Sequence, residues 1–298
     1  MLEFKPILLS DKKAIDACLA GNTYRACDFC FANIFTWQPM FKTTFTIVQD
    51  TLFIRYKCRA DRFCYTIPVG KMPLEKSLQM IMDDAKKRNT PFAMNGVTVQ
   101  MWEEINAVMP DTFRFIPDRD NDEYIYLTEK LISLAGKKLQ SKRNHINRFK
   151  KDNPDWHYFA LSSPEDLHEC VEMLDMWEDI NLYKAEKSLQ YDYLATKTML
   201  ENFDALDLRG GFIRVNGKIV AFTIGQPLTD DTFVIHVEKA YSKINGAYAI
   251  INQQFAENEA AAYKYINREE DMGIENLRKA KQSYYPDILL QERVVMLK

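Results

Sequence analysis

The hydrophobic and polar positions change period along the chain in an order that repeats once. Apolar and polar residues alternate over 43–48, 51–58 and 63–69, as they do in strands. Leu78, Met82 and Ala85 then recur at helical spacing, in a helix that begins after Pro73 and ends near Arg88. A strand at 92–94, a helix at 97–108 and strands at 113–117 and 123–127 follow. The first half therefore predicts strands, a helix, a strand and a helix, with two more strands after them.

The second half repeats this order of elements without a close repeat of sequence. A strand at 156–161 precedes a helix capped by Ser163, and another helix covers 187–203. Asn216-Gly217 joins strands 208–215 and 218–227 in a hairpin, and 231–238 adds a third antiparallel strand. The half is completed by a helix at 247–263, a strand over 263–267, a helix at 274–281 and a final segment at 288–297.

A basic helix separates the two halves. Residues 137–151 contain seven Lys or Arg and no acid, while Leu139, Ile146 and Phe149 fall on one helical face. Asp152-Asn-Pro154 ends the helix, because proline cannot continue it. We therefore expect an N-terminal domain at 1–150 and a C-terminal domain at 151–298 that carries the main site.

Composition excludes several classes of protein. A hydrophobic fraction of 47% and a charged fraction of 27% are typical of a globular chain and not of a disordered one. The formal charge of -3 excludes a generally basic nucleic-acid binder, so affinity for RNA or anionic lipid requires a local patch. No apolar run exceeds five residues, against about 20 needed to span a bilayer.

The cysteines indicate a reducing compartment and no metal site. Six cysteines are spread through a long chain that shows no secretory leader, so we expect reduced thiols in the cytoplasm. Cys27 and Cys30 have C-x-x-C spacing, but Cys58 and Cys64 are too loosely spaced to supply the second ligand pair of a zinc site. A packing role is the favoured interpretation.

Charged residues gather where the strand over 263–267 ends. Asn267 is followed by Arg268, Glu269, Glu270 and Asp271, and Gly273 closes the turn. Open α/β sheets bind ligands at the carboxyl ends of their strands, so this strand end predicts a site. The alternative is a solvated turn whose acids pair with Arg278 and Lys279. The acidic stretch 118–122, which lies between two predicted strands, is interpreted as solvated surface.

The same stretch resembles a known family. Asn267-Arg-Glu-Glu-Asp-Met-Gly-Ile-Glu275, with Leu277-Arg-Lys-Ala-Lys281 and Tyr284-Tyr-Pro286, resembles the signature of the phosphatidylglycerol lysyltransferase C-terminal-domain family. The run Lys142-Arg143-Asn144 matches that family too. The family is similar in fold to Fem-type aminoacyl transferases, in which a Lys at the place of Lys281 contacts aminoacyl-tRNA. The resemblance implies an α/β (α+β) chain of two tandem GNAT-like, acyl-CoA N-acyltransferase-like domains, with mixed central sheets flanked by helices.

The predicted catalytic residues lie on the last strands of the second half, in the turn after them and on the helix at 274–281. His236 and Glu238 are two apart on one strand and are expected on the same side of the sheet. Glu238 is predicted to be a base or an acid that binds an amine, and the alternative is an ion pair with Lys239 or Lys243. His236 is more typical of a satisfied strand histidine. The predicted catalytic set is Glu238, Lys281, Asn267 and Glu269, with Lys281 at a developing oxyanion.

The turn over 241–247 corresponds to the place where acetyltransferase-like folds bind phosphates, at a helix N-terminus. Its predicted cofactor contacts are Lys243, Asn245 and Gly246. Lys243 and Gly246 match half of the acetyltransferase pattern, whereas Tyr248 stands at a position that needs a small residue. A bulky Tyr248 would crowd the pyrophosphate of coenzyme A, which favours a donor other than acetyl-CoA.

The basic helix is interpreted as a contact for phosphates, with a solvated face on a connecting helix as the alternative. Its charges suit either a tRNA acceptor arm or an anionic lipid head group. The predicted substrate or tRNA contacts are Lys137, Lys142, Arg143, Asn144 and Arg148 on this helix, with Arg268, Arg278 and Tyr284 near the strand end.

Together these features lead to one expected function and two alternatives. We expect transfer of an aminoacyl group from charged tRNA to a hydroxyl or amine acceptor, such as the head group of phosphatidylglycerol, with no cofactor. The alternatives are an N-acetyltransferase that uses acetyl-CoA and a non-catalytic relative that binds lipid or RNA. The expected partners are aminoacyl-tRNA and an anionic membrane surface or phospholipid head group. The expected location is the cytoplasm, with a peripheral membrane position as the alternative.

Overall fold

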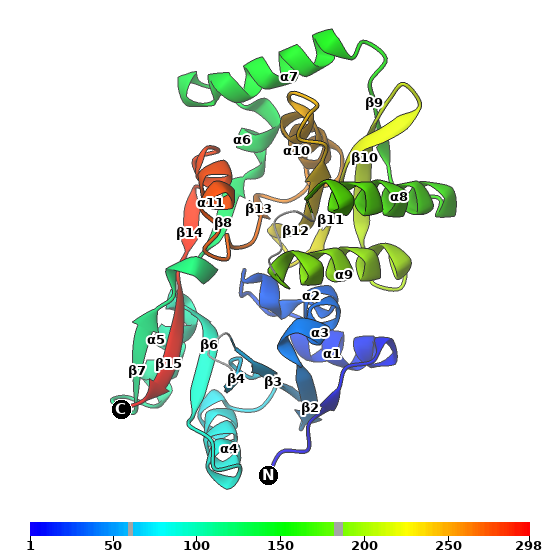
Figure 1. The fold of residues 1–298 in the computed structure, drawn as a ribbon. Coiled ribbons are helices and arrows are strands. Elements are labelled where there is room, and N and C mark those ends of the chain that lie inside the picture. Colours follow the sequence, from blue (N-terminus) through cyan, green and yellow to red (C-terminus); the bar gives the residue numbers. More distant parts are fainter. Residues whose placement is uncertain (59–61, 182–186) are drawn as a thin grey trace. The chain divides into compact units, whose positions relative to one another are not determined.

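The computed structural model describes residues 1–58, 62–181 and 187–298 (Figure 1). These residues form two β-sheets and divide into two compact units. Unit 1 comprises Met1–Glu123, Glu270–Arg278 and Leu289–Lys298. Unit 2 comprises Tyr124–Glu269 and Lys279–Ile288.

The sheet of unit 1 is mixed. Its strands are β1 (Lys5–Pro6), β2 (Thr44–Val48), β3 (Thr51–Lys57), β4 (Phe63–Tyr65), β5 (Val69–Gly70), β6 (Ala93–Thr98), β7 (Phe113–Pro117) and β15 (Glu292–Leu297). They lie in the order β1-β2-β3-β4-β6-β15-β7, with β5 beside β3. β4 and β6 are parallel, whereas β15 pairs with both β6 and β7 in antiparallel fashion.

Helices complete the core of unit 1. They are α1 (Lys12–Leu19), α2 (Phe31–Thr36), α3 (Gln38–Phe41), α4 (Leu74–Lys87) and α5 (Val99–Val108). Leu78 and Ile81 of α4 and Met101 of α5 pack with Phe53 of β3 and Val295 of β15 in one apolar cluster. The last strand of the chain is therefore part of the first core.

Unit 2 contains most of the second sheet, apart from Glu123 and residues 289–290. Its strands are β8 (Glu123–Leu127), β9 (His157–Ala160), β10 (Arg209–Val215), β11 (Lys218–Pro227), β12 (Thr232–Ala240), β13 (Tyr265–Asn267) and β14 (Ile288–Leu290), in the order β14-β8-β13-β12-β11-β10-β9. β10, β11 and β12 are successively antiparallel, and β13 returns parallel to β12. Asn216 and Gly217 both have positive φ, as the tight hairpin between β10 and β11 requires.

Helices cover both faces of this sheet. They are α6 (Thr128–Ser133), α7 (Gln140–Asp152), α8 (Pro164–Asn181), α9 (Lys187–Glu201) and α10 (Ala247–Asn258), while α11 (Glu275–Gln282) is divided between the units. Glu238 of β12 is bonded to Asn252 of α10, whereas the next residue, Lys239, contacts Trp177 of α8 and Asp192 of α9. Because neighbouring strand residues point to opposite faces, α10 lies on one face and α8 and α9 lie on the other (Figure 1).

β12 and β13 separate after a short pairing. They pair from Thr232 opposite Tyr265 to Val234 opposite Asn267, and β12 then continues to Ala240. The chain after β13 stays beside β8, because the Arg268 N–H donates to the Tyr124 carbonyl and the Tyr124 N–H donates to the Glu269 carbonyl. Side chains from the free stretch of β12 therefore face residues 268–269.

The order of elements predicted for the two halves is confirmed. The structure has strands, a helix, a strand and a helix in each half, in a mixed α/β chain with two mixed sheets. The acidic stretch 118–122 was expected to be solvated, and this expectation is wrong for Asp122. Its side chain is buried and accepts a hydrogen bond from the Glu292 N–H at 2.9 Å. Asp120 is also engaged, by Arg278.

The division between the units differs from the expected boundary at residue 150. The segment 124–150 belongs to unit 2, because Tyr126, Leu131, Ile146 and Phe149 pack into the same apolar cluster as Phe255 of α10. Residues 289–298 belong to unit 1, because β15 completes its sheet. Both assignments depend on pairings between distant segments.

Candidate functional site

The end of β13 is fixed by a buried asparagine. Asn267 is fully buried, and its side-chain Oδ1 accepts a hydrogen bond from the Glu269 N–H at 2.7 Å. Glu269 has a φ of 58°, in the left-handed region, so the chain turns sharply there. Asn267 was predicted to be catalytic. In the structure it shapes the turn that presents Arg268 and Glu269.

Glu238 lies at the centre of the polar cluster of unit 2. Its Oε1 accepts from Arg268 Nη2 at 3.0 Å, and its Oε2 accepts from Asn252 Nδ2 at 3.0 Å. The side chains of Glu238 and Arg268 are only 13% and 11% exposed, so this is a largely desolvated ion pair. Burial opposes the charge of Arg268, but Glu238 outweighs it and raises the pKa of the guanidinium. The alternative expected for Glu238 was an ion pair with Lys239 or Lys243; in the structure Glu238 pairs with Arg268, and Lys239 pairs with Asp192.

Two tyrosines frame this ion pair. The Arg268 guanidinium lies 4.9 Å from the ring centroid of Tyr284 and 5.7 Å from that of Tyr126. The two rings meet edge to face. Burial raises the pKa of both phenols, which are therefore neutral near pH 7. Tyr284, predicted to contact substrate, is one wall of the cluster.

Lys281 supports the cluster from α11. Its side chain is buried, and its Nζ donates to the Arg268 carbonyl at 2.5 Å. The Lys281 carbonyl accepts from the Tyr126 hydroxyl at 2.7 Å. The structure thus brings Lys281, Arg268 and Glu238 together. Lys281 contacts the backbone of Arg268 and so positions that residue.

Lys142 points into this cluster from the basic helix. Its Nζ donates to Ser283 Oγ at 2.6 Å and lies 4.1 Å from the ring centroid of Tyr284. Burial, with a smaller contribution from the Arg268 charge, lowers the pKa of its ammonium group. Lys142 was grouped with the phosphate contacts of an exposed face, but the structure leaves it half-buried beside Arg268 and Glu238.

His236 of β12 pairs with Glu269 in the same region, beyond the point where β12 and β13 stop pairing. Its Nδ1 lies 2.7 Å from Glu269 Oε1, and its side chain is 1% exposed. The register opposite β11 passes from Val237 to Ile235, so His236 is an extra residue in a β-bulge. The expectation that His236 and Glu238 point to the same side assumed an uninterrupted strand, and the bulge removes that basis. Bulges often re-aim side chains beside active sites.

The turn between β12 and α10 packs against the basic helix. Asn245 Oδ1 lies 3.0 Å from His145 Nδ1. Gly246 has a φ of 83°, and a Cβ at this position would lie 2.3 Å from the His145 carbonyl oxygen. Helix packing therefore explains why glycine is required there, while Lys243 is exposed. The cofactor contacts proposed for Lys243, Asn245 and Gly246 stay a prediction.

The basic helix divides its cations between solvent and structure. Lys137, Asn144 and Arg148 are exposed, as a phosphate-binding face requires. Arg148 forms an ion pair with Asp152 at 2.5 Å. Arg143 instead donates to the carbonyls of Leu134 and Gly136, just after the end of α6. This arginine caps a helix, which its spacing on the helical face could not reveal.

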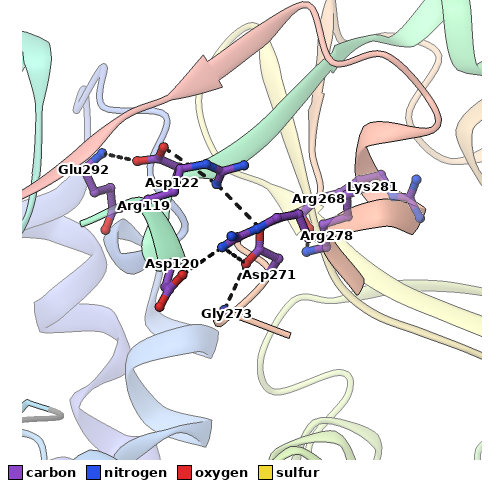
Figure 2. A network of polar contacts seen from close by, with 9 residues as sticks. All are labelled: Arg119, Asp120, Asp122, Arg268, Asp271, Gly273, Arg278, Lys281 and Glu292. Carbon is purple, nitrogen blue, oxygen red and sulfur yellow. Dashed lines mark hydrogen bonds and ion pairs between the residues drawn. The ribbon is translucent and has the colours of Figure 1, made fainter. Parts of the chain in front are cut away.

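Arg278 belongs to a network in unit 1 (Figure 2). Its Nη2 donates to Asp120 at 2.8 Å and to Asp271 Oδ1 at 2.7 Å, and its Nε donates to Asp271 Oδ2 at 2.8 Å. Asp271 is fully buried and also accepts from the Gly273 N–H, and Arg119 lies 3.5 Å from it. The ion pair between the turn and Arg278 that the sequence suggested is present, and it gives Arg278 a structural role.

Unit 1 also holds a group of four acids: Asp28, Glu123, Glu270 and Glu292. The Cys27 N–H donates to both oxygens of Glu123, at 3.0 and 3.1 Å. Burial, and then the charge of Glu270, raises the pKa of Asp28 to about 6. Burial and the neighbouring Glu123 raise the pKa of Glu292 well above its usual value. Among the described residues, no group of His, Cys, Asp and Glu is arranged to hold a metal ion.

The cysteines agree with a packing role. All six are buried and none forms a disulfide. Cys30 Sγ donates to the Cys27 carbonyl, and the Asn33 amide donates to Cys27 Sγ. The C-x-x-C spacing therefore belongs to a local turn at the start of α2.

Sequence reasoning missed two members of the unit 2 cluster. Asn252 is fully buried among the apolar residues of α10, and a polar residue on such a face was the available signal. Tyr126 lies in the apolar run Tyr124–Leu127 of β8, like any core tyrosine, so nothing in the sequence marked it. The cluster offers cations, aromatic faces and a carboxylate within hydrogen-bonding reach of one another.

Comparison with known proteins places the chain in a wider group. The family model described as phosphatidylglycerol lysyltransferase, C-terminal, matches residues 22–293. A crystal structure of a conserved protein of unknown function from Bacteroides thetaiotaomicron is 41% identical, has a TM-score of 0.93 and is covered completely in both chains. A protein of Mycoplasmoides gallisepticum is 25% identical over 178 residues, which are 58% of this chain and 55% of that protein. The match thus spans about half the length of that relative.

Two more distant structures share the fold. L-PGS from Bacillus licheniformis has a TM-score of 0.68 at 17% identity, over 99% of this chain and 93% of that one. The C-terminal domain of a putative lysylphosphatidylglycerol synthetase from Agrobacterium fabrum has a TM-score of 0.65 at 12% identity, over 95% and 91%. Within the described part of the chain, no helix combines the length and apolar character needed to cross a membrane.

Proposed function

The chain belongs to the family of the phosphatidylglycerol lysyltransferase C-terminal domain, and from that premise we propose that it is an aminoacyl transferase. The donor is an aminoacyl-tRNA, and the acceptor is a hydroxyl or amine such as that of a phosphatidylglycerol head group. The site is the cluster around Glu238 and Arg268 in unit 2.

One observation carries the proposal. Lys142, Arg268 and Lys281 come from three separate elements and gather around Glu238 and Tyr284, where β12 separates from β13. Attack on an aminoacyl ester develops negative charge on the carbonyl oxygen, and both donor and lipid acceptor carry phosphates. Fixed cations in a largely buried setting stabilise such charges more strongly than water does.

The reaction needs a base and a set of positive groups. The oxygen of the acceptor hydroxyl attacks the carbonyl carbon, and its proton passes to the base. The tetrahedral intermediate then collapses with cleavage of the bond to the ribose oxygen of tRNA, which receives a proton. The products are the aminoacyl ester of the acceptor and uncharged tRNA.

For the base we favour the pair of His236 and Glu269 over Glu238. Each oxygen of Glu238 already accepts a hydrogen bond, one from Arg268 and one from Asn252, which fits a positioning group better than a base. A carboxylate at 2.7 Å from a histidine nitrogen fixes the tautomer and the orientation of the ring, as the third member of a catalytic triad does. In this scheme Glu238 binds substrate and positions Arg268.

The test is transfer itself. The purified chain is incubated with vesicles of phosphatidylglycerol and either tRNA charged with a labelled amino acid or labelled acetyl-CoA. The products are followed by mass spectrometry, and parallel reactions contain a cell extract in place of vesicles. We expect labelled product from charged tRNA. Label that passes only from acetyl-CoA would overturn the donor.

A matched pair of variants ties the activity to the cluster. Lys281 and Lys279 lie on the same helix, and Lys279 is exposed whereas Lys281 is buried against Arg268. We expect Lys281→Ala to reduce transfer while Lys279→Ala retains it. Equal transfer by both variants would remove Lys281 from the site.

A further inference from the structure

Three buried polar atoms around Glu238 have no hydrogen-bond partner among the residues that the structure describes: Thr223 Oγ1, Asn252 Oδ1 and Arg268 Nη1. Thr223 and Asn252 are both fully buried. A buried polar group that lacks a partner is costly, so several of them around one carboxylate require a polar occupant.

Each atom is tied to Glu238 by geometry. Thr223 is directly opposite Glu238 in the ladder between β11 and β12, so their side chains share a face. Asn252 uses its Nδ2 on Glu238, which leaves Oδ1 without a donor. Arg268 uses Nη2 on the same carboxylate and leaves Nη1 without an acceptor. The three atoms therefore surround the same place.

Their chemistry specifies the occupant. Asn252 Oδ1 and the carboxylate of Glu238 accept hydrogen bonds, the hydroxyl of Thr223 can accept or donate, and Arg268 Nη1 donates. A complementary group presents N–H donors on one side and an oxygen acceptor on the other. An α-aminoacyl group has this arrangement, because its amino nitrogen is carried by the carbon next to the carbonyl group.

We propose that Thr223, Asn252 and Glu238 bind the α-amino group of the transferred aminoacyl residue, while Arg268 Nη1 donates to its carbonyl oxygen. This inference rests on the proposed function and adds the residues that distinguish donors. An acetyl group has the carbonyl oxygen but lacks the amino group, so it leaves Asn252 and Thr223 without partners. Sites built around buried polar groups strongly reject ligands that leave those groups unpaired.

Binding of small amides tests the inference without tRNA. L-alaninamide carries the amino group and carbonyl of the donor in a form that resists hydrolysis, and propionamide lacks only the amino group. The affinities of both for the full chain are measured by ligand-observed NMR or calorimetry. We expect L-alaninamide to bind tighter than propionamide by about tenfold or more. N-acetyl-L-alaninamide, which blocks the amino group, should bind like propionamide.

Matched threonine variants locate the effect. Thr128 on α6 is also buried, and its Oγ1 has no partner within the described part of the chain, so Thr128→Val removes the same group with the same change of shape elsewhere in unit 2. We expect Thr223→Val to reduce the preference for L-alaninamide by about threefold to tenfold, and Thr223→Ser to restore it. Thr128→Val should retain the full preference. Thermal melting of all three variants reports whether they fold.

The outcomes separate this inference from the proposed function. Equal binding of the amides by a chain that transfers aminoacyl groups would reject the amino-group site alone and assign the three atoms to water. A clear preference for L-alaninamide without transfer from any charged tRNA would reject the proposed function alone. Loss of the preference in Thr128→Val as well as Thr223→Val would show that the discrimination is not local to Glu238.

Discussion

The polar network of unit 1 and the polar cluster of unit 2 both take residues from the stretch 267–281. They differ in how far the hydrogen-bonding groups of those residues are paired. In unit 1, each oxygen of Asp271 accepts from Arg278, and Gly273 adds a backbone donor (Figure 2). In unit 2, Arg268 donates to Glu238 with one nitrogen and leaves the other buried without a partner. Arg268 and Arg278 are ten positions apart in the chain.

This difference separates stabilisation from recognition. Asp271 is held by Arg278 and a backbone N–H within unit 1, so removing its charge should affect folding. Buried groups with unused donors and acceptors are retained at a cost in stability, which is typical of binding and catalytic sites. The charged residues that follow β13 in the sequence therefore serve two roles, stabilisation of unit 1 and recognition in unit 2.

The largest expected effect compares the two arginines. Arg268→Lys keeps the charge but loses the planar fork, so it cannot contact Glu238 and a substrate oxygen together. We expect transfer in the labelled assay to fall at least about 100-fold. Arg278→Lys should keep transfer within about threefold, because Arg278 contacts acids of unit 1.

Thermal melting is the control for both arginine variants. The comparison fails if Arg278→Lys melts like the native chain and yet loses transfer to the extent of Arg268→Lys. That result would restore the substrate contact predicted for Arg278 from the sequence.

Next in size is the stability of the unit 1 network. Asp271→Asn keeps the shape of a fully buried side chain but removes the charge that pairs with Arg278. We expect the free energy of unfolding, measured with urea, to fall by about 2 kcal/mol. Asp152→Asn, which alters an exposed pair with Arg148, should change it by less than about 0.5 kcal/mol. Equal effects would show that the network contributes no more than a surface pair.

The buried acids of unit 1 predict an unusual dependence of stability on pH. The pKa of Asp28 rises to about 6 in the folded chain, from 3.8 without burial. Between these values the folded state binds more protons than the unfolded state, so stability falls as pH rises through the window. We expect the free energy of unfolding to be about 1 kcal/mol higher at pH 5 than at pH 7. Glu292, whose pKa is also raised, acts in the same direction.

Other carboxyls set the lower limit of this window. Hydrogen bonds from Arg88, Tyr65 and the Leu2 N–H outweigh burial and lower the pKa of Asp84. The stability contributed by Asp84 is present above pH 3.8 and is lost as pH falls through its folded pKa, outside the range compared.

Urea unfolding of Asp28→Asn at pH 5 and pH 7 tests whether Asp28 causes the pH dependence. A difference as large as that of the native chain would exclude Asp28 as its source.

Local patterns predicted the elements well, because hairpins and amphipathic helices are set by neighbouring residues. Asn216 and Gly217 specify their turn in the sequence alone, and Ser163 caps its helix through the Asp166 N–H as expected. The boundary at residue 150 could not be predicted in the same way. It depends on β15 joining β6 and on Phe149 packing with α10, which are pairings between distant segments.

Only part of the candidate site could be predicted, because the rest depends on pairings between distant segments. Glu238, Lys281 and Tyr284 could be chosen by residue type and by resemblance, and the structure brings them together. Thr223 is an ordinary strand residue, and its meaning comes from the register that places it opposite Glu238. Lys142 and Arg143 adjoin in sequence on one basic face, yet one enters the cluster and the other caps α6.

The smallest expected effect concerns the basic face of α7. The structure shows which of its residues are suitable for a test. Lys137 and Lys151 are exposed, whereas Arg143 is bonded to backbone carbonyls and its removal would mix folding with binding. If the face contacts phosphates of charged tRNA, log affinity falls with log salt, by roughly 0.7 to 0.9 per contact. We expect Lys137→Ala and Lys151→Ala each to reduce that slope by less than one contact, since an exposed lysine shares its phosphate with neighbouring cations. Lys218→Ala, at an exposed position on β11, is the control and should leave the slope unchanged. Filter binding of charged tRNA between low and moderate salt gives the slopes, and a slope equal to that of the native chain in the double variant would assign the face to solvent.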